Sequence, residues 1–271
     1  MLDPSAIDAA LRSGRDFELA RIEEAGLNAA QPREQLLIDG WLLRFSPGKA
    51  RRSRSVNAVA AGAMALDDKL SLCRRWYQRF GLPLIIRVTP FSQPAGLDEH
   101  LAAAGFVAYD ETRVMTCRLS EAPGDRDGLL ARDVDSRAFA EAVGSLRESP
   151  SRQIEAHRRR LRDCPLQATT ARLVAYRADG TPLAAGQVVV QDDLAGLYDI
   201  VTAVGARGQG VGRAVSRRLL AAAAALGARS AYLQVDAGNV PARRIYSALG
   251  FVDRYAYWYR RPADVVDQIL D

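Results

Sequence analysis

The sequence predicts an α/β (α+β) fold built from two successive copies of one arrangement. Helical and strand patterns alternate along all 271 residues. The order helix, strands, helix, strand, helix, Gly-Phe, strands occurs twice, with Gly105-Phe106 in the first half and Gly250-Phe251 in the second. A recurring order indicates a repeated structural unit. We therefore predict two domains, 1–120 and 128–271, joined across the Pro-, Gly- and charge-rich stretch Ser120–Asp127.

The first half shows a helical pattern followed by alternating strands and helices. The predicted elements are a helix over residues 3–30, a strand Leu36–Phe45, a turn Ser46-Pro47-Gly48, an extended segment Ser53–Val59, a helix Leu66–Phe80 ended by Gly81, a strand Leu84–Thr89, a helix Leu97–Ala104 ended by Gly105, and one or two strands in Phe106–Leu119.

The second half is predicted in the same way. Its elements are helices Ser136–Leu146 and Pro150–Asp163 with Ser149 as cap, strands Arg172–Arg177 and Ala184–Gln191 joined through an Asp179-Gly180 hairpin, a strand Leu197–Ala203, a helix after Gly212 stopped by Gly227, a strand Ser230–Val235, a helix after Asn239, and a last hairpin through Trp258.

The central feature is a strand that runs into a glycine-rich loop and then a helix, in Leu197–Gly212. The first turn of a helix presents free N–H groups and the positive end of its dipole. Glycines let such a backbone approach an anion closely, and Arg207 and Arg213 add positive charge. The pattern therefore predicts a site for a phosphate or pyrophosphate.

Two common phosphate loops are excluded by residue type. A nucleotide triphosphatase loop ends in Gly-Lys-Ser/Thr, whereas Arg213 and Ala214 follow Gly212 here. A dinucleotide loop has a third glycine three positions after Gly212, where Val215 stands. The pattern that remains is Arg207-x-x-Gly210-x-Gly212.

This loop and a second motif resemble the GNAT superfamily of acyl-CoA-dependent N-acyltransferases. The second motif is N-x-x-A-x-x-x-Y-x-x-x-G-F, with Asn239, Tyr246 and Gly250-Phe251, and it follows the Ser230–Val235 strand. The resemblance implies two tandem domains, each a mixed, mostly antiparallel twisted sheet flanked by helices. It also implies acetyl-CoA as the acyl donor and no metal.

The resemblance also assigns residues to the donor site. The loop would bind the CoA pyrophosphate, and a splayed strand would bond the pantetheine arm through its backbone; a plain strand–helix connection is the alternative for the loop. The implied cofactor-binding residues are Val201, Thr202, Ala203, Arg207, Gly208, Gln209, Gly210, Val211, Gly212, Arg213, Asn239 and Tyr246.

Two residues are expected to be catalytic. Tyr246 would be the general acid that protonates the departing thiolate, with a core tyrosine as the alternative. Asp199 would be the general base for the amine, although Glu is more usual in the superfamily, and a structural ion pair is the alternative. By strand period, Asp199 is expected to share a face with Leu197 and Val201.

The first half resembles a degenerate copy of this domain. Where a pyrophosphate loop should be, Asn57–Leu66 holds one glycine and no arginine, and the helix before Gly105 lacks the matching tyrosine. We therefore expect one acetyl-CoA per chain, at the second half. In the first half, Gly40–Arg44 and Arg51–Asn57 resemble the N-terminal segment of tandem bacterial GNAT proteins.

Other candidate groups have ordinary structural interpretations. His157 is expected to pack, and His100 lies in the degenerate half, so neither is expected to react. The run Arg51-Arg52-Ser53-Arg54 is either a solvated loop or a clamp for an acidic substrate at the domain interface. Half of Tyr255, Tyr257, Trp258 and Tyr259 should be core by alternation, and the rest would line an acceptor pocket or a dimer surface.

Composition narrows the class of protein. The chain is 48% hydrophobic and 25% charged, as globular proteins are, and no apolar run has the length of a membrane span. The start lacks an export pattern and Cys73, Cys117 and Cys164 are isolated, so we expect a cytoplasmic protein with no metal. The net charge of +5 suits an anionic ligand, and no nucleic-acid-binding module is recognisable.

The expected function is N-acetylation of a primary amine by direct attack on acetyl-CoA in a ternary complex. A small-molecule amine is the favoured acceptor and a protein amine the alternative, with the protein a monomer or homodimer. Transfer of another acyl group and a non-catalytic acyl-CoA-binding sensor are the competing interpretations.

Overall fold

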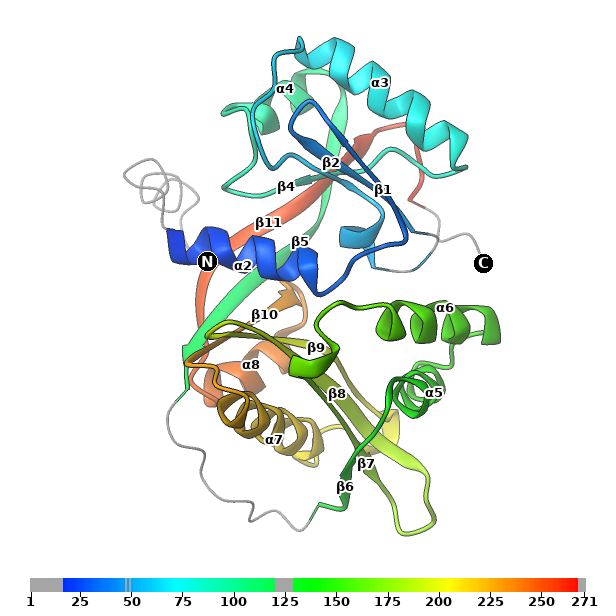
Figure 1. Cartoon of the computed structure of the whole chain (residues 1–271), viewed down its shortest axis with the longest axis vertical. Helices are drawn as coiled ribbons and strands as arrows, with labels where there is room; N and C mark the ends of the chain where they lie inside the picture. Colours follow the sequence, from blue (N-terminus) through cyan, green and yellow to red (C-terminus); the bar gives the residue numbers. More distant parts are fainter. Residues whose placement is uncertain (1–16, 47, 49, 120–128, 268–271) are drawn as a thin grey trace. The chain divides into compact units, whose positions relative to one another are not determined.

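The computed structural model describes residues 17–46, 48, 50–119 and 129–267 (Figure 1). The chain divides into two compact units that interleave in the sequence. Unit 1 contains Ala30–Arg113, the chain from Tyr255 onward and the start of the first helix, and unit 2 contains Ile22–Ala29 and Val114–Arg254. The contiguous domains 1–120 and 128–271 remain a prediction, and the linker Ser120–Asp127 lies outside the described residues.

Unit 1 is a mixed sheet in the strand order β1-β2-β3-β4-β11-β5. Its elements are α2 (Phe17–Asn28, shared with unit 2), β1 (Glu34–Ile38), β2 (Trp41–Phe45), η1 (Arg51–Ser53), β3 (Val56–Asn57), α3 (Leu66–Arg79), β4 (Ile86–Val88), α4 (Leu97–Ala103), the first part of β5 (Phe106–Arg118) and most of β11 (Val252–Pro262). Helices α3 and α4 cover one face, where Leu70, Cys73 and Leu101 pack on Leu43 and Ile86.

Unit 2 is a mixed, mostly antiparallel sheet in the order β5-β10-β9-β8-β7-β6. Its elements are β6 (Ala131–Asp133), α5 (Ser136–Leu146), α6 (Ser151–Arg162), η2 (Gln167–Thr169), β7 (Thr170–Tyr176), β8 (Pro182–Gln191), β9 (Leu194–Thr202), η3 (Val204–Ala206), α7 (Val211–Ala225), β10 (Ser230–Asp236) and α8 (Val240–Ala248).

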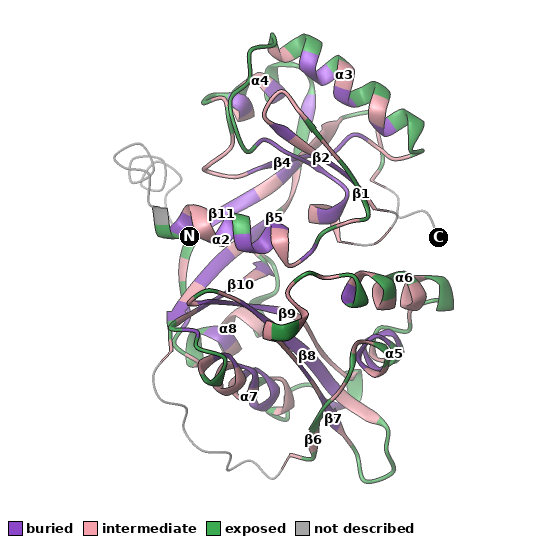
Figure 2. Cartoon of the chain, in the orientation of Figure 1, coloured by how far each residue is buried: buried purple, intermediate pink, exposed green. Residues whose placement is uncertain are grey.

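The sheet of unit 2 is buried on both faces (Figure 2). Ala184 of β8 packs with α7 and α8 in one core cluster, and its neighbour Ala185 packs with α5 and α6 in another. Successive residues of a strand point to opposite faces, so α7 and α8 cover one side and α5 and α6 the other. Two-sided burial explains why β8 is almost continuously apolar.

The predicted strand Leu36–Phe45 is wrong, because the segment is a hairpin. β1 and β2 pair antiparallel from Glu34↔Phe45 to Ile38↔Trp41, and Asp39 and Gly40 turn the chain with φ of 43° and 82°. Asp-Gly is a strong hairpin signal, but apolar residues on both sides of it made the segment resemble one strand.

Other predictions differ at the second half and at the ends. The last hairpin through Trp258 is instead one strand, β11, in which Trp258 pairs with Val88 of β4. Pro150, not Ser149, is the N-cap of α6, and no side chain caps that helix. In β11, Tyr255, Tyr257 and Tyr259 are all buried and Trp258 is half-buried. The predicted helix over residues 3–30 is described only as α2, since residues 1–16 lie outside the described part of the chain.

Among the described helices, none is long and apolar enough to cross a membrane.

Candidate functional site

The site is built where two parallel strands of unit 2 separate. β9 and β10 pair at four positions, from Leu194↔Ser230 to Leu197↔Leu233. Beyond Leu197, β9 continues to Thr202 and pairs only with β8. Among the described residues, no strand pairs with Val201 and Thr202 on the β10 side, as the sequence resemblance implies for a donor site. Ala203 differs from that expectation, because its N–H donates to the carbonyl of Leu183 and its C=O accepts from Ala206.

A β-bulge at Asp199 lies at the inner end of this opening. Gln187 of β8 pairs with Tyr198, and Ala185 pairs with Val201, so two residues of β9 oppose Gly186 alone. Asp199 has a φ of 52°, which is uncommon for a residue with a side chain. The extra residue shifts the alternation of the strand. Leu197 packs with α7 and Val201 with α5, so the expectation that Asp199 shares a face with both is wrong.

The loop after β9 presents the N-terminus of α7 to solvent. Gly208 and Gly210 have φ of 77° and 80°, which favour glycine, and a Cβ at either would meet nothing within 4 Å. Gly210 is the N-cap of α7 and brings no capping side chain, so the first N–H groups of the helix have no side-chain cap. Arg207 and Arg213 are exposed on either side. An anion fits this arrangement.

Tyr246 lies on α8, whose N-terminus is capped by Asn239 accepting a hydrogen bond of 3.2 Å from the backbone N–H of Ala242. The Tyr246 ring is 8% exposed and packs edge-on against Phe251, with centroids 5.9 Å apart. Burial raises the pKa of Tyr246 to about 12. Within the described residues no hydrogen bond reaches the Tyr246 hydroxyl. The hydroxyl is therefore protonated and free to donate a hydrogen bond to a ligand.

The Asp199 side chain is held by groups from three elements. Its Oδ1 accepts a 3.1 Å hydrogen bond from Arg147, which directly follows α5. Its Oδ2 lies 3.2 Å from Nε2 of His157 and 3.8 Å from Nη2 of Arg160, both on α6. Gln187 of β8 donates its Nε2 to the same oxygen at 3.0 Å. The expectation that His157 only packs is therefore wrong.

These contacts fix the charge of Asp199. Burial by itself would raise the pKa of this carboxyl group, but the hydrogen bond from His157 and the positive charges of Arg147 and Arg160 outweigh it. The pKa of Asp199 is consequently held well below its ordinary value of 3.8. In this state the Asp199 carboxylate mainly forms ion pairs and is only a weak base.

Gln187 is a functional candidate that sequence reasoning missed. Gln187 is 6% exposed, and among the described residues no hydrogen-bond partner reaches its Oε1. A buried polar side chain in an otherwise apolar strand is the signal that could have identified it, since buried amides are normally fully bonded.

The comparisons with known proteins identify the family. The family model "Probable histone acetyltransferase Rv0428c C-terminal" matches residues 18–260. The chain belongs to this family of GNAT acetyltransferases. An uncharacterized N-acetyltransferase, YobR of Bacillus subtilis, is 30% identical over 244 residues, which cover 83% of this chain and 91% of that protein.

Solved structures show the same fold. A GCN5-related N-acetyltransferase from Kribbella flavida is 17% identical, covers 93% of this chain and 97% of its own, and has a TM-score of 0.66. A tandem GNAT protein from the clavulanic acid biosynthesis pathway is 17% identical over 74% of this chain and 70% of its own, with a TM-score of 0.57.

Unit 1 of this acetyltransferase also has a helix between two parallel strands, with a carboxylate bound directly before that helix. β3 and β4 are parallel and flank α3, as β9 and β10 flank α7. Directly before α3, the Asp39 carboxylate accepts hydrogen bonds from the backbone N–H groups of Ala63, at 2.8 Å, and Met64, at 3.0 Å. Lys69 lies 2.5 Å from the same carboxylate. An internal anion thus binds the backbone directly before α3.

The arginine run of unit 1 also binds an internal carboxylate. Arg54 is 3% exposed and bonds Asp267, which Arg51 contacts at 2.6 Å. The Tyr109 hydroxyl donates to Asp267 at 3.0 Å. The run is therefore not simply a solvated loop. His100, the other candidate histidine, lies 3.0 Å from exposed Asp67.

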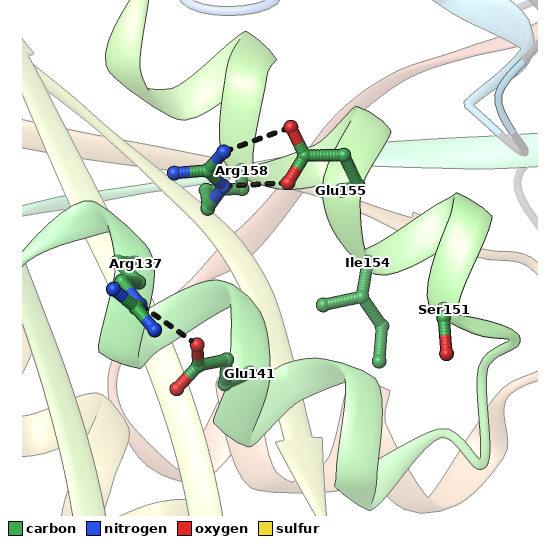
Figure 3. Close-up of a pocket in the computed structure, with 6 residues that line it drawn as sticks. All are labelled: Arg137, Glu141, Ser151, Ile154, Glu155 and Arg158. Carbon is green, nitrogen blue, oxygen red and sulfur yellow. Dashed lines mark hydrogen bonds and ion pairs between the residues drawn. The ribbon is translucent and has the colours of Figure 1, made fainter.

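A shallow cavity of about 400 Å³ lies between α5 and α6 (Figure 3). Its lining residues are Arg137, Glu141, Ser151, Ile154, Glu155 and Arg158. The guanidinium of Arg137 contacts Glu141 at 3.0 Å, and that of Arg158 contacts Glu155 at 2.6 Å. The charged side chains that line this cavity pair with one another, so we assign it no binding or catalytic role. Among the described residues, no cluster of His, Cys, Asp or Glu could hold a metal ion.

Proposed function

We propose that the protein transfers an acetyl group from acetyl-CoA to a primary amine by direct attack in a ternary complex. The observation that carries the proposal is the opening between β9 and β10, which begins after Leu197↔Leu233 and leads to the Gly208–Gly210 loop. An extended acyl donor with a pyrophosphate at one end matches both features. The family membership supports acetyl transfer as the reaction.

In this proposal the donor lies along the outer half of β9. The N–H groups at the start of α7, with Arg207 and Arg213, bind the pyrophosphate. The backbone of Val201 and Thr202 bonds the pantetheine arm as an added strand would. The thioester then reaches the inner end of the opening, near the bulge at Asp199. Asn239 contributes through α8, because it caps the helix that carries Tyr246.

The acceptor binds as the free amine, after its ammonium form has lost a proton to solvent. Its nitrogen then attacks the thioester carbonyl carbon and forms a C–N bond. Backbone N–H groups of the open strand stabilise the oxyanion of the tetrahedral intermediate. The C–S bond then breaks, and Tyr246 gives its hydroxyl proton to the departing thiolate. The raised pKa of Tyr246 keeps its hydroxyl protonated before the C–S bond breaks, and solvent returns a proton to the phenolate afterwards.

Asp199 is proposed to take the amine proton after the C–N bond has formed. A carboxylate with a strongly lowered pKa is too weak a base to deprotonate a free ammonium group. The nitrogen of the tetrahedral intermediate is cationic and much more acidic, so a weak base suffices there. His157, Arg147 and Arg160 position this carboxylate and are not themselves assigned a proton.

One donor is proposed per chain. The carboxylate of Asp39 already accepts the backbone N–H groups of Ala63 and Met64 in the counterpart position of unit 1. A pyrophosphate there would have to displace a carboxylate tethered next to Lys69. We therefore expect unit 1 to bind no acyl-CoA of its own.

The test is calorimetry with acetyl-CoA, followed by a thiol-release assay over a library of primary amines. We expect one site per chain and thiol release that depends on an amine. Two equal sites would contradict the assignment of unit 1. Tight acetyl-CoA binding without release by any amine would favour the alternative function, an acyl-CoA sensor, and release only with longer acyl donors would favour another acyl group.

A further inference from the structure

The side chains around Asp199 indicate which chemical class of acceptor the site would bind. If the thioester reaches the inner end of the β9–β10 opening, the amine must approach it beside the bulge. The side chains gathered at that point are Asp199, Gln187, His157, Arg147 and Arg160. This inference rests on the proposed function and concerns the chemical class of its acceptor.

Positive charge predominates in this group. Arg147 and Arg160 bring two guanidinium groups to the single Asp199 carboxylate. Arg147 is 41% exposed, and the one hydrogen bond from its guanidinium to Asp199 leaves it able to donate others, because the group carries five N–H donors. Helix α6 supplies both Arg160 and His157.

The same place holds an acceptor atom that no donor reaches among the described residues. This atom is Oε1 of Gln187, which is buried, while Nε2 of the same amide donates to Asp199. A buried acceptor left without a donor costs free energy, and an N–H group of a ligand would satisfy it. Gln187 and Asp199 together therefore provide acceptors for an amine within a cationic surround.

We propose that the acceptor is an amine that also carries a carboxylate or phosphate group. Its anionic group is bound by Arg147, with Arg160 adding positive charge, and its amine N–H is bound by Gln187 Oε1. Positive charge at the site attracts such a molecule and repels a lysine-rich peptide. The proposal therefore predicts that a basic histone tail, the acceptor type in the description of the family model, is a poor acceptor for this chain.

The test compares amines that differ only in the anionic group, at saturating acetyl-CoA. The probes are 4-aminobutanoate against butylamine, O-phosphoethanolamine against ethanolamine, and a lysine-rich peptide. We expect kcat/KM to be about 10–100-fold higher for at least one anionic member than for its neutral partner, the usual worth of a charged hydrogen bond. The two pairs distinguish a carboxylate from a phosphate. The preference should decrease as ionic strength rises.

Two variants locate the effect. Arg147→Gln should lower the ratio of kcat/KM for the preferred anionic amine to kcat/KM for its neutral partner by about tenfold or more, because any effect through the position of Asp199 acts on both amines alike. Arg137→Gln is the matched control, because Arg137 lies on the adjacent helix α5, is 73% exposed and pairs with Glu141. Arg160→Gln repeats the test if the first variant does not fold.

The outcomes separate this inference from the proposed function. Efficient acetylation of the lysine-rich peptide or of neutral amines, with no preference for anionic ones, would overturn the acceptor class and leave the acetyltransferase proposal standing. An equal effect of Arg137→Gln and Arg147→Gln would likewise overturn it. Absence of thiol release with every amine would contradict the proposed function, and the acceptor class with it.

Discussion

Leu197 and Leu233 form the last backbone pair between β9 and β10. Two residues later, the bulge at Asp199 redirects β9, which then follows β8 alone to Thr202. The opening is therefore a property of backbone register, and the side chains beyond Leu197 do not need to be of any particular type to create it. Three helices then place the other features around this opening. Helix α7 follows the glycine-rich loop, α8 carries Tyr246, and α6 carries His157 and Arg160, which contact Asp199.

Reversing charge in the loop should weaken donor binding. Arg207→Glu and Arg213→Glu each replace an exposed cation beside the start of α7 with an anion that repels the pyrophosphate. We expect the Kd for CoA, measured by calorimetry, to rise about 10–100-fold in each variant. Arg229→Glu is the control, since Arg229 is exposed beyond the opposite end of the same helix. Equal effects of all three reversals would show that only net charge matters.

Removing the charge of Asp199 should cost stability in a pH-dependent way. Asp199→Asn leaves His157, Arg147 and Arg160 without their carboxylate and should cost about 3 kcal/mol at pH 7. The lowered pKa means that this contribution is full above about pH 4 and is lost as pH falls further toward the folded-state pKa. The free energies of unfolding of wild type and variant, from urea titrations, should therefore converge in acid.

Asp253→Asn is the matched control for that measurement. Asp253 contacts Arg243 at 2.8 Å, and the two side chains are 20% and 31% exposed. Its loss should cost about 1 kcal/mol or less. If both substitutions lower the free energy of unfolding by the same amount, the ion pairs of Asp199 contribute no more than an ordinary surface ion pair.

The hairpin of unit 1 predicts a large difference between two glycine substitutions. Gly40 and Gly81 both have positive φ, so alanine costs about 1 kcal/mol of backbone strain at either. A Cβ at Gly40 would also lie 2.5 Å from the carbonyl oxygen of Ala60, whereas a Cβ at Gly81 meets nothing within 4 Å. Gly40→Ala should therefore lower the melting temperature clearly more than Gly81→Ala. A reversed order would show that β1 and β2 are not turned as described.

The alkaline limb of the pH profile tests the state of Tyr246. With a pKa of about 12, the hydroxyl keeps its proton throughout ordinary assay conditions. We expect no loss of kcat from tyrosine ionisation between pH 7 and about pH 11. A decline near pH 10 that disappears in Tyr246→Phe would mean that the hydroxyl is less buried than the structure indicates.

Sequence patterns predicted the second half better than the first because its signals are local. Helix α5 is Ser136–Leu146 as predicted, and Asn239 caps α8 as its position in the motif indicates. The bulge at Asp199 could not be predicted, since it depends on the register against Gln187 and Ala185 of another strand.

The partners of Asp199 escaped prediction for the same reason. His157, Arg147 and Gln187 are 42, 52 and 12 residues away in sequence, and only tertiary packing brings them together. The two internal anions of unit 1 are equally non-local. Nothing near Asp39 indicates Ala63, and nothing near Arg54 indicates Asp267.

The most direct test of the account is turnover and donor affinity in Tyr246→Phe, measured side by side by thiol release and calorimetry. The substitution removes one hydroxyl that bonds nothing in the described fold and keeps the ring on Phe251. Tyr176→Phe, in β7 of the same unit, is the control for loss of a tyrosine hydroxyl. We predict that Tyr246→Phe lowers kcat about 10²–10⁴-fold with an unchanged Kd for acetyl-CoA, and that Tyr176→Phe changes neither. Wild-type turnover in Tyr246→Phe would contradict the account.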